Sequence, residues 1–174
     1  ERVIHYVFVK AGAQAELSER PSRAAGLRLL YRGPHSPGTL TGYAAERGIP
    51  AVLAEIGGST LYADPRYLER ARDGALNVMR TLRMLTDPAP GPVEQLLLTR
   101  RTLVRVPVGG IFPPAVGLEA IDAELPGDTL LGTVIDPYTL EEVAAIRAPY
   151  ARSALLQLRV LPSAVQPGDY AFII

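Results

Sequence analysis

Cysteine is absent from the 174 residues of this sequence. Its absence excludes disulfide bonds and metal sites built on thiolates, but it leaves the redox compartment open because a cysteine-free chain suits either environment. The sequence also lacks any run of 18 apolar residues and any charged segment followed by an apolar signal-like segment. We therefore expect a soluble, cytoplasmic protein with no membrane partner.

An excess of charge of either sign is also lacking. The 18 basic residues, 17 of them arginine, balance 18 acidic ones, so the formal net charge is zero. No basic field of the kind that binds nucleic acid is visible, and we expect no nucleic-acid partner. The hydrophobic content of 48% is enough to bury the core of one medium domain or two small ones.

The most informative stretch is the almost wholly apolar run of residues 49–58, which predicts a buried β-strand. It carries one carboxylate, Glu55, shortly before Gly57 and Gly58. Ligands of open α/β folds bind outside the carboxyl ends of strands, where glycine lets a substrate come close to the backbone. Glu55 is therefore a candidate general base. The alternative is a strand-end residue paired with one of the arginines.

The first half of the chain alternates strand and helix patterns, as in a parallel α/β sheet. In chain order, we expect a strand at Arg2–Lys10, a helix from about Ser22, a strand at Leu29–Tyr31, a short helix through Ala44–Arg47 and the Glu55 strand. The short helix can be capped by Thr39 or Thr41.

A clearer helix is predicted after the glycines, because Asp64 suits the N-cap and Pro65 the first helical position. Apolar residues recur every three or four positions and so share one face: Leu68, Ala71, Ala75, Val78, Met79, Leu82 and Leu85. A solvated opposite face is predicted at Arg66, Arg70, Asp73, Arg80 and Arg83. Gly74 predicts a close contact between this helix and a strand.

A stiff segment with alternating prolines, residues 88–98, is the predicted boundary between two domains, 1–87 and 99–174. Beyond it the sequence turns to short β patterns, and two pairs of segments repeat at offsets of about 41. The repeated segments are Pro126–Val134 with Pro167–Ile174, and Arg105–Val108 with Arg147–Tyr150. This pattern predicts two similar β halves related by a pseudo-twofold axis.

The repeated β pattern resembles the biotinyl/lipoyl type of β domain, also called a barrel-sandwich hybrid. In such domains a lysine in the hairpin between the halves carries the cofactor. The hairpin region here, Asp136–Ala145, has no lysine, and the only lysine of the chain is Lys10. A swinging-arm carrier is therefore excluded.

Taken together, the two halves resemble a known hydrolase family. The residues that carry the resemblance are Gly48–Gly58, the Gly74–Leu85 helix with Asn77, Val108–Phe112, Leu131-Gly132 with Asp136, Ala148-Pro149 and Gly168-Asp169. They resemble the C-terminal part of the succinylglutamate desuccinylase/aspartoacylase family of zinc-carboxypeptidase-like hydrolases, over roughly residues 33–174. The implied fold is the end of an α/β catalytic domain followed by a barrel-sandwich-like β domain. Because the chain starts at Glu1 within a strand pattern, we expect it to be a piece of a longer protein.

The resemblance implies a zinc-dependent deacylase that acts on N-acyl amino acids or similar small amides. In this family two histidines and a glutamate hold Zn²⁺, and a separate strand-end glutamate moves a proton from water to the leaving amine. Glu55 matches that general base. The metal ligands of the family lie upstream of the matched part, so we expect no zinc site and no turnover in this chain alone.

Two departures from the family bear on the site. The only histidines are His5 and His35, which lack metal-ligand spacing, and a substitute site made of these two with Glu55 is disfavoured. The arginine with which some relatives hold a substrate carboxylate is missing, since Ala44 and Ala45 stand near its place. The substrate-binding residues therefore stay unknown.

A second function class remains open: a non-catalytic binding or assembly module that presents its β domain to a partner or, as a homo-oligomer, to another copy of itself. Catalysis predicts that Glu55 is solvent-accessible in a cleft. The module predicts a buried or salt-bridged Glu55 and an apolar patch exposed on the β domain.

Overall fold

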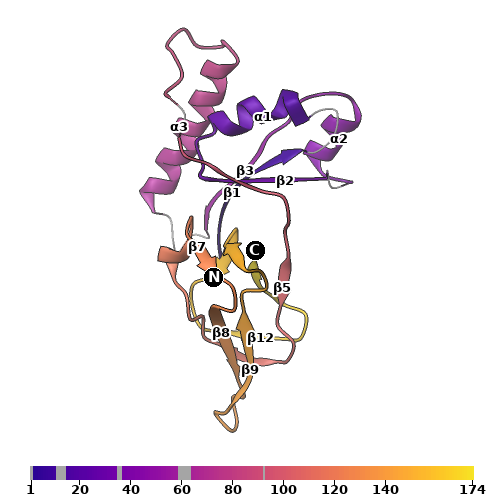
Figure 1. The fold of residues 1–174 in the computed structure, drawn as a ribbon, viewed down its shortest axis with the longest axis vertical. Helices are drawn as coiled ribbons and strands as arrows, with labels where there is room; N and C mark the ends of the chain where they lie inside the picture. The colour runs from indigo at the N-terminus through magenta and orange to yellow at the C-terminus, as the bar shows by residue number, and fades with distance from the viewer. Residues whose placement is uncertain (1, 11–14, 35–36, 59–63, 92) are drawn as a thin grey trace. The chain divides into compact units, whose positions relative to one another are not determined.

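The computed structural model describes residues 2–10, 15–34, 37–58, 64–91 and 93–174. The chain divides into two compact units (Figure 1). We call them the α/β unit, made of His5–Gly57 and Ala63–Arg100, and the β unit, made of Glu1–Ile4, Gly58–Tyr62 and Arg101–Ile174. The mixed α/β class predicted from the sequence is confirmed. The predicted domain boundaries of 1–87, 88–98 and 99–174 stay predictions.

The α/β unit is built on parallel strands. Its elements are β1 (Arg2–Lys10), α1 (Ala15–Ala24), β2 (Leu29–Gly33), α2 (Leu40–Glu46), β3 (Leu53–Gly58), α3 (Pro65–Thr81) and β4 (Leu96–Leu98). The strand β2 pairs in parallel with β1 on one side and with β4 on the other, and β3 also pairs with β1. Leu29 and Leu30 are fully buried, as expected for a central strand with both faces covered.

The strand β3 is shorter and more exposed than the sequence predicted. It begins at Leu53 instead of residue 49, and both Leu53 and Ala54 are exposed. Among the described strands β3 pairs with β1 alone, so it forms an edge of the sheet. An apolar run forms a buried strand only where both faces and both edges are covered, and the described residues leave Leu53 and Ala54 uncovered.

The first helix also differs from the prediction, because it spans Ala15–Ala24 and does not start near Ser22. Ser22 lies inside the helix, and its hydroxyl donates a hydrogen bond to the carbonyl of Ser18 at 2.7 Å. Serine is a common N-cap, which favoured a helix start at Ser22, whereas here the helix begins at Ala15 and contains Pro21. Gly26, with φ of 75°, follows the end of the helix.

The helix α3 begins as predicted. The carboxylate of Asp64 accepts a hydrogen bond from the backbone N–H of Arg66 at 2.9 Å, and Pro65 opens the helix. A close contact at Gly74 is present, but its partner is not a strand: a Cβ atom there would lie 2.7 Å from the carbonyl oxygen of Ala25, just beyond α1. Gly74 therefore lets the two helices approach each other.

The predicted apolar face of α3 is only partly used inside the α/β unit. Gly74 is the buried residue of the helix, and Val78 packs against the small core formed by Ala25 and Leu27. Leu68 is 69% exposed and Leu82 is 55% exposed. Spacing alone cannot tell which part of an apolar face meets the core of the same unit.

The β unit contains short strands and a turn of 3-10 helix. Its elements are β5 (Leu103–Arg105), β6 (Gly110–Phe112), η2 (Leu118–Ala120), β7 (Glu124–Pro126), β8 (Leu130–Ile135), β9 (Glu142–Arg147), β10 (Arg152–Ala154), β11 (Gln157–Arg159), β12 (Ser163–Val165) and β13 (Tyr170–Ile173). The strands pair in the orders β12-β6-β8-β9, β10-β7 and β11-β13-β5. At the centre of the core, the rings of Phe112 and Phe172 meet edge to face at 5.9 Å between centroids.

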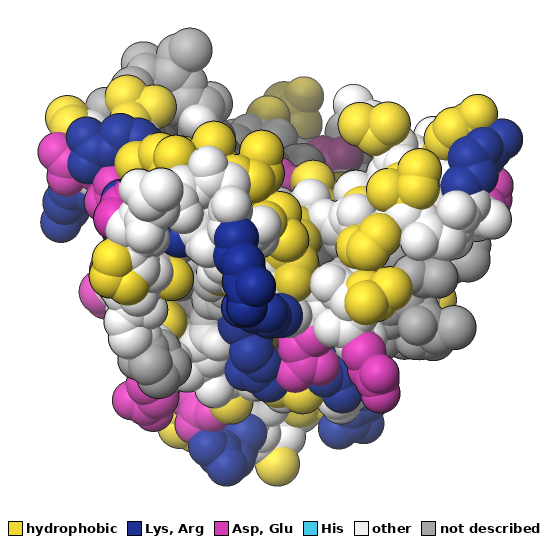
Figure 2. All heavy atoms as spheres, turned by 90° about the horizontal axis from the view of Figure 1, so that it is seen from above, with side chains coloured by type: hydrophobic (Ala, Val, Ile, Leu, Met, Phe, Trp, Pro, Cys, Tyr) yellow, Lys and Arg dark blue, Asp and Glu magenta, His cyan; other side chains and the backbone are white. Residues whose placement is uncertain are grey.

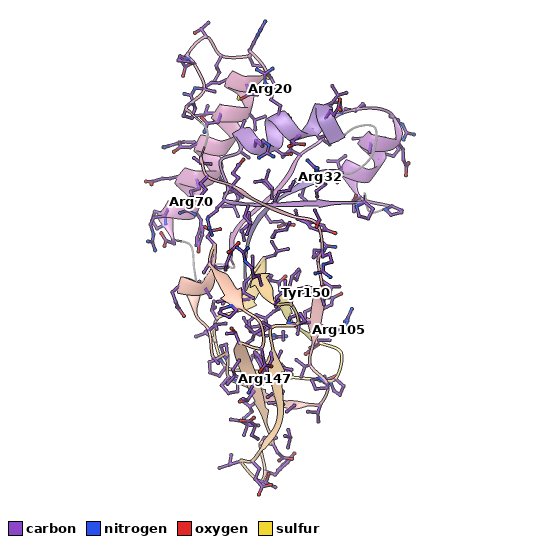
Figure 3. The ribbon with its side chains drawn as sticks, viewed as in Figure 1. Arg20, Arg32, Arg70, Arg105, Arg147 and Tyr150 are labelled. Atoms are coloured by element: carbon purple, nitrogen blue, oxygen red, sulfur yellow. The ribbon has the colours of Figure 1, made fainter. Side chains whose placement is uncertain are left out.

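The two Pro-Gly-Asp sequences both form tight turns with one left-handed residue, Asp128 (φ 61°) in the first and Gly168 (φ 89°) in the second. An arginine holds each turn: Arg147 donates to the carbonyl of Asp128 at 2.9 Å, and Arg105 donates to the carbonyl of Gly168 at 2.5 Å (both arginines are labelled in Figure 3). In both turns, the N–H of the left-handed residue donates to the carbonyl of the residue after that arginine.

Among the helices of the described residues, none is long and apolar enough to cross a membrane.

Candidate active site at the Glu55 strand

Glu55 is the third residue of β3, and its side chain is half-buried. Within the described part of the chain, no residue donates a hydrogen bond to its carboxylate or forms an ion pair with it. The alternative prediction, in which an arginine pairs with Glu55, is therefore not observed among these residues. A carboxylate that is partly exposed and unpaired is able to accept a proton from a bound reactant.

The neighbouring residue, Ile56, shows which way Glu55 points. Ile56 packs against Ala25 and Leu27, together with Val78 of α3. Because successive side chains of a strand point to opposite faces, Glu55 projects from the face of the sheet away from this small core.

Gly57, the last residue but one of β3, constrains the backbone near the end of the strand. Its φ of 85° lies in the left-handed region, and a Cβ atom there would be 3.1 Å from both Cβ and Cγ of Tyr67 on α3. Only glycine meets both conditions without strain. The start of α3 is thereby held against the strand two residues after Glu55. The role of these glycines in admitting a substrate stays a prediction.

The helix α2 follows β2 and leads into the Glu55 strand. Thr39 caps it, because its hydroxyl accepts a hydrogen bond from the N–H of Gly42 at 3.0 Å, which decides between the two predicted caps. Ala44 and Ala45 lie within α2. Arg47 follows the helix, but its guanidinium stacks over the ring of Tyr43 at 3.4 Å. None of these residues supplies an unengaged guanidinium for a substrate carboxylate.

A second arginine, Arg32, stands near the carboxyl end of β2 (Figure 3). Its Nη2 donates to Glu19 of α1 at 2.5 Å, and Arg23 donates to the same carboxylate. The hydrogen bond from Arg23, with the nearby charge of Arg32, holds the pKa of Glu19 below its ordinary value of 4.5. Sequence reasoning missed this cluster, since residues 13 positions apart give no local signal. Glu19 engages Arg32, so the arginine is not a ready substitute for the missing one.

The α/β unit also contains a pocket of about 350 Å³. It is lined by Arg23, Ala24, Gly26, Asn77, Thr81, Ala89, Pro90, Gly91, Val93 and Gln95. Glu55 is not among these residues, so the pocket is separate from the candidate base. Asn77, one of the residues behind the family resemblance, accepts a hydrogen bond from Arg80 at 3.0 Å.

The two histidines stay untested. His5 lies within β1, of whose side chains the structure describes none, and His35 lies outside the described residues. Among the side chains that are described, no three histidine, cysteine, aspartate or glutamate residues gather as a metal site would require.

Comparison with known proteins gives matches in structure but not in sequence: no family model and no curated protein matches the chain. The ectoine utilization protein EutE (DoeB) from Ruegeria pomeroyi superposes with a TM-score of 0.82 at 18% identity, over 99% of this chain and 54% of that one. A succinylglutamate desuccinylase/aspartoacylase from Rhodobacter sphaeroides gives 0.79 at 16% identity, over 99% and 54%. An aspartoacylase family protein from Mesorhizobium loti gives 0.76 at 19% identity, over 98% and 51%.

The chain thus spans about half the length of the solved proteins that it matches. A match to half of each chain is what the resemblance to a C-terminal portion predicted. At these identities the comparison concerns the fold. The resemblance inferred from the sequence is confirmed at that level: this chain has the fold of a portion of the succinylglutamate desuccinylase/aspartoacylase family proteins.

Proposed function

We propose that this chain is part of a zinc-dependent deacylase, an amidohydrolase of N-acyl amino acids or similar small amides, and that Glu55 is its general base. The observation that carries the proposal is the half-buried carboxylate of Glu55 on β3, which has no partner among the described residues, in a chain whose fold matches proteins named desuccinylase and aspartoacylase.

The chemistry assigned to Glu55 is proton transfer. Its carboxylate takes a proton from water as the water oxygen bonds to the amide carbonyl carbon. The same proton then passes to the amide nitrogen as the C–N bond breaks, which yields an amine and a carboxylic acid that releases its remaining proton to the solvent. A paired Glu55 would be a poorer base, because a neighbouring guanidinium stabilises the charged form. The absence of such a pair among the described residues favours this role.

The described residues of this chain do not fit a zinc ion, because they bring no three suitable side chains together. The proposed Zn²⁺ would be held by residues outside residues 1–174, and no step is assigned to His5 or His35. The proposed partner is a small N-acyl amino acid or amide, with no nucleic acid and no membrane, and the proposed location is the cytoplasm.

For the β unit we propose a barrel-sandwich-like domain with an internal pseudo-twofold repeat. Support comes from strand pairs that would exchange under such an axis: β5 pairs with β13 as β9 pairs with β8, and β6 pairs with β12 as β10 pairs with β7. The two arginine-held turns are a further matched pair.

A specific observation also favours the second candidate, a binding or assembly module. The hairpin between β8 and β9 exposes 93% of Tyr138 and 74% of Leu140. The tip is held in shape by the carboxylate of Asp136, which accepts hydrogen bonds from the N–H groups of Tyr138 and Thr139. Large apolar side chains on an ordered tip are typical of contact surfaces.

The test is to measure zinc content and N-acyl amino acid hydrolysis side by side, on this chain and on the longest form that its source DNA encodes. The proposal expects one zinc per chain and turnover in the longer form, and neither in residues 1–174 alone. A longer form that binds no metal, or that hydrolyses no N-acyl amino acid or small amide, would favour the binding module.

A further inference from the structure

The pocket of the α/β unit does not include Glu55, and the proposed reaction gives it no role. Three segments of this unit line it: the end of α1, the second half of α3 and the extended chain that follows Pro88. Its volume of about 350 Å³ is near the lower limit of small-molecule sites, which span roughly 300–1,000 Å³. The pocket therefore has room for a small molecule.

The side-chain amide oxygens at the pocket already have hydrogen-bond partners. Oε1 of Gln95 accepts from Nη1 of Arg23 at 3.3 Å, and Nε2 of Gln95 donates to the carbonyls of Arg23 and Leu27, each at 3.0 Å. Oδ1 of Asn77 accepts from Nη1 of Arg80 at 3.0 Å. These contacts fix both amides, so neither amide oxygen is available to a donor of a ligand.

The donors at the pocket are left over. Within the described part of the chain, neither Nδ2 of Asn77 nor the hydroxyl of Thr81 donates to another residue. The two residues are four positions apart on α3 and so share one side of the helix. On the α1 side, Nε, Nη1 and Nη2 of Arg23 each donate once, to Glu19 or Gln95, which leaves two of its five N–H groups. The pocket therefore favours a ligand that carries hydrogen-bond acceptors.

The charges around the pocket favour an anion. Basic and acidic side chains lie next to each other on the face that Figure 2 shows, so the balance has to be counted from ion pairs. Glu19 is shared by Arg23 at 2.7 Å and Arg32 at 2.5 Å, whereas Arg80 has its own partner, Asp87, at 2.6 Å. These five groups carry three positive and two negative charges. One positive charge beside the pocket is thus not neutralised within this set, which attracts a negative ligand.

The rest of the lining indicates which anion fits. A carboxylate is planar and its two oxygens accept several hydrogen bonds on one side, while the carbon atoms behind it are apolar. A phosphate has polar oxygens on every side. The remaining lining residues are small and apolar, and suit an aliphatic body: Ala24, Gly26, Ala89, Pro90, Gly91 and Val93.

We propose that this pocket binds a small aliphatic carboxylate, whose oxygens accept hydrogen bonds from Arg23, Asn77 and Thr81. The site is separate from the candidate base. The proposal does not depend on Glu55 or on the deacylase reaction, and its test needs no turnover.

Nuclear magnetic resonance tests the proposal on residues 1–174. Asn77 is the only asparagine of the chain, so labelling asparagine with ¹⁵N gives a single side-chain amide signal. We expect sodium butyrate, at an ionic strength held constant with sodium chloride, to shift this signal saturably with a dissociation constant of about 1 mM. Butyramide, butylammonium and inorganic phosphate should each bind at least about tenfold more weakly.

Two outcomes of this titration overturn the proposal. One is the lack of a saturable shift at butyrate concentrations well above the expected constant. The other is binding of butyramide, butylammonium or phosphate as tight as that of butyrate, since the site would then not select a carboxylate.

Variants locate the ligand. Asn77→Asp keeps the oxygen that accepts from Arg80 and replaces the Nδ2 donor by a carboxylate oxygen, so it should abolish binding. Thr81→Val keeps the shape of the side chain, removes the hydroxyl and should weaken binding roughly three- to tenfold. The backbone amide signal of residue 81 follows binding in both variants, and circular dichroism checks their fold.

The matched control is Gln166→Glu, which adds the same charge as Asn77→Asp at an exposed residue of the β unit and should leave the dissociation constant unchanged. Parent-like binding by Asn77→Asp or by Thr81→Val overturns the assigned contacts. So does a loss of binding in Gln166→Glu that equals the loss in Asn77→Asp, because overall charge would then explain both.

Discussion

Replacing Gly57 by alanine should destabilise the α/β unit more than an ordinary loop substitution does. The φ of 85° places a non-glycine residue in the left-handed region, at a cost of about 1–2 kcal/mol. The new Cβ atom would also lie 3.1 Å from two carbon atoms of Tyr67, and relief of such crowding costs roughly 1 kcal/mol or more. Alanine recovers about 0.5 kcal/mol because it restricts the unfolded chain. The net loss is about 2 kcal/mol.

Two other glycines of the same unit separate these contributions. Gly38 has a φ of 77° and nothing within 4 Å of its Cβ position, so Gly38→Ala should show only the backbone cost, about 1 kcal/mol after the same correction. Gly91 has open space and no left-handed φ, so Gly91→Ala should be neutral or slightly stabilising. The expected order of destabilisation is Gly57→Ala, then Gly38→Ala, then Gly91→Ala.

Urea unfolding followed by helical circular dichroism measures this order, because α1, α2 and α3 all belong to the α/β unit. Equal losses for Gly57→Ala and Gly38→Ala would refute the role assigned to the Tyr67 contact. A neutral Gly57→Ala would refute the strand-end geometry itself, and with it the placement of Glu55 two residues earlier.

Three further predictions concern packing and charge. Gly74→Ala should destabilise by about 1–3 kcal/mol in urea unfolding, although alanine favours helix, because its Cβ atom would lie 2.7 Å from the carbonyl of Ala25; a stabilised variant would contradict the close approach. Glu19→Gln should cost about 0.5–1 kcal/mol at neutral pH. Since the pKa of Glu19 is lowered in the folded chain, its contribution is present above pH 4.5 and lost as the pH falls below it; a loss that is equal in acid and at neutral pH would argue against the ion pairs. Arg159→Leu should cost about 1–3 kcal/mol, since Nε of this buried arginine donates to the carbonyl of Tyr170 at 2.8 Å; thermal melting unchanged from the parent chain would show that this bond is dispensable.

Local signals in the sequence predicted local structure well. The Asp64-Pro65 start of α3, the threonine cap of α2 and the Pro-Gly-Asp turns each depend on residues within a few positions of one another. Such signals act through the backbone of the same segment and need no information on distant neighbours.

The sequence predictions that differ from the structure concern contacts between residues far apart in the chain. Whether the Glu55 strand is buried depends on which strands flank it, and β3 is flanked by β1 alone among the described strands. The apolar positions of α3 were identified, but their spacing did not tell which of them meet Ala25 and Leu27 and which stay exposed. The ion pair of Arg32 with Glu19 joins two elements that only the folded sheet brings together.

For the candidate site, the sequence supplied Glu55 itself and its place on a strand. It could not supply the substrate-binding groups, because α2, which contains Ala44 and Ala45 near the place of the missing arginine, has no arginine of its own. The sequence also could not show that the Glu55 carboxylate has no partner among the described residues, because this depends on the fold around it.

The central claim, that Glu55 is a general base, is tested most directly by the kcat of N-acyl amino acid hydrolysis in the longer form. Wild type and Glu55→Gln are compared at equal zinc content, with Glu46→Gln, a change of an exposed glutamate in α2, as the matched control. The account predicts that Glu55→Gln lowers kcat by about 10²- to 10⁴-fold while zinc content and fold are kept, and that Glu46→Gln is unchanged. A Glu55→Gln variant with the kcat of the wild type would contradict it.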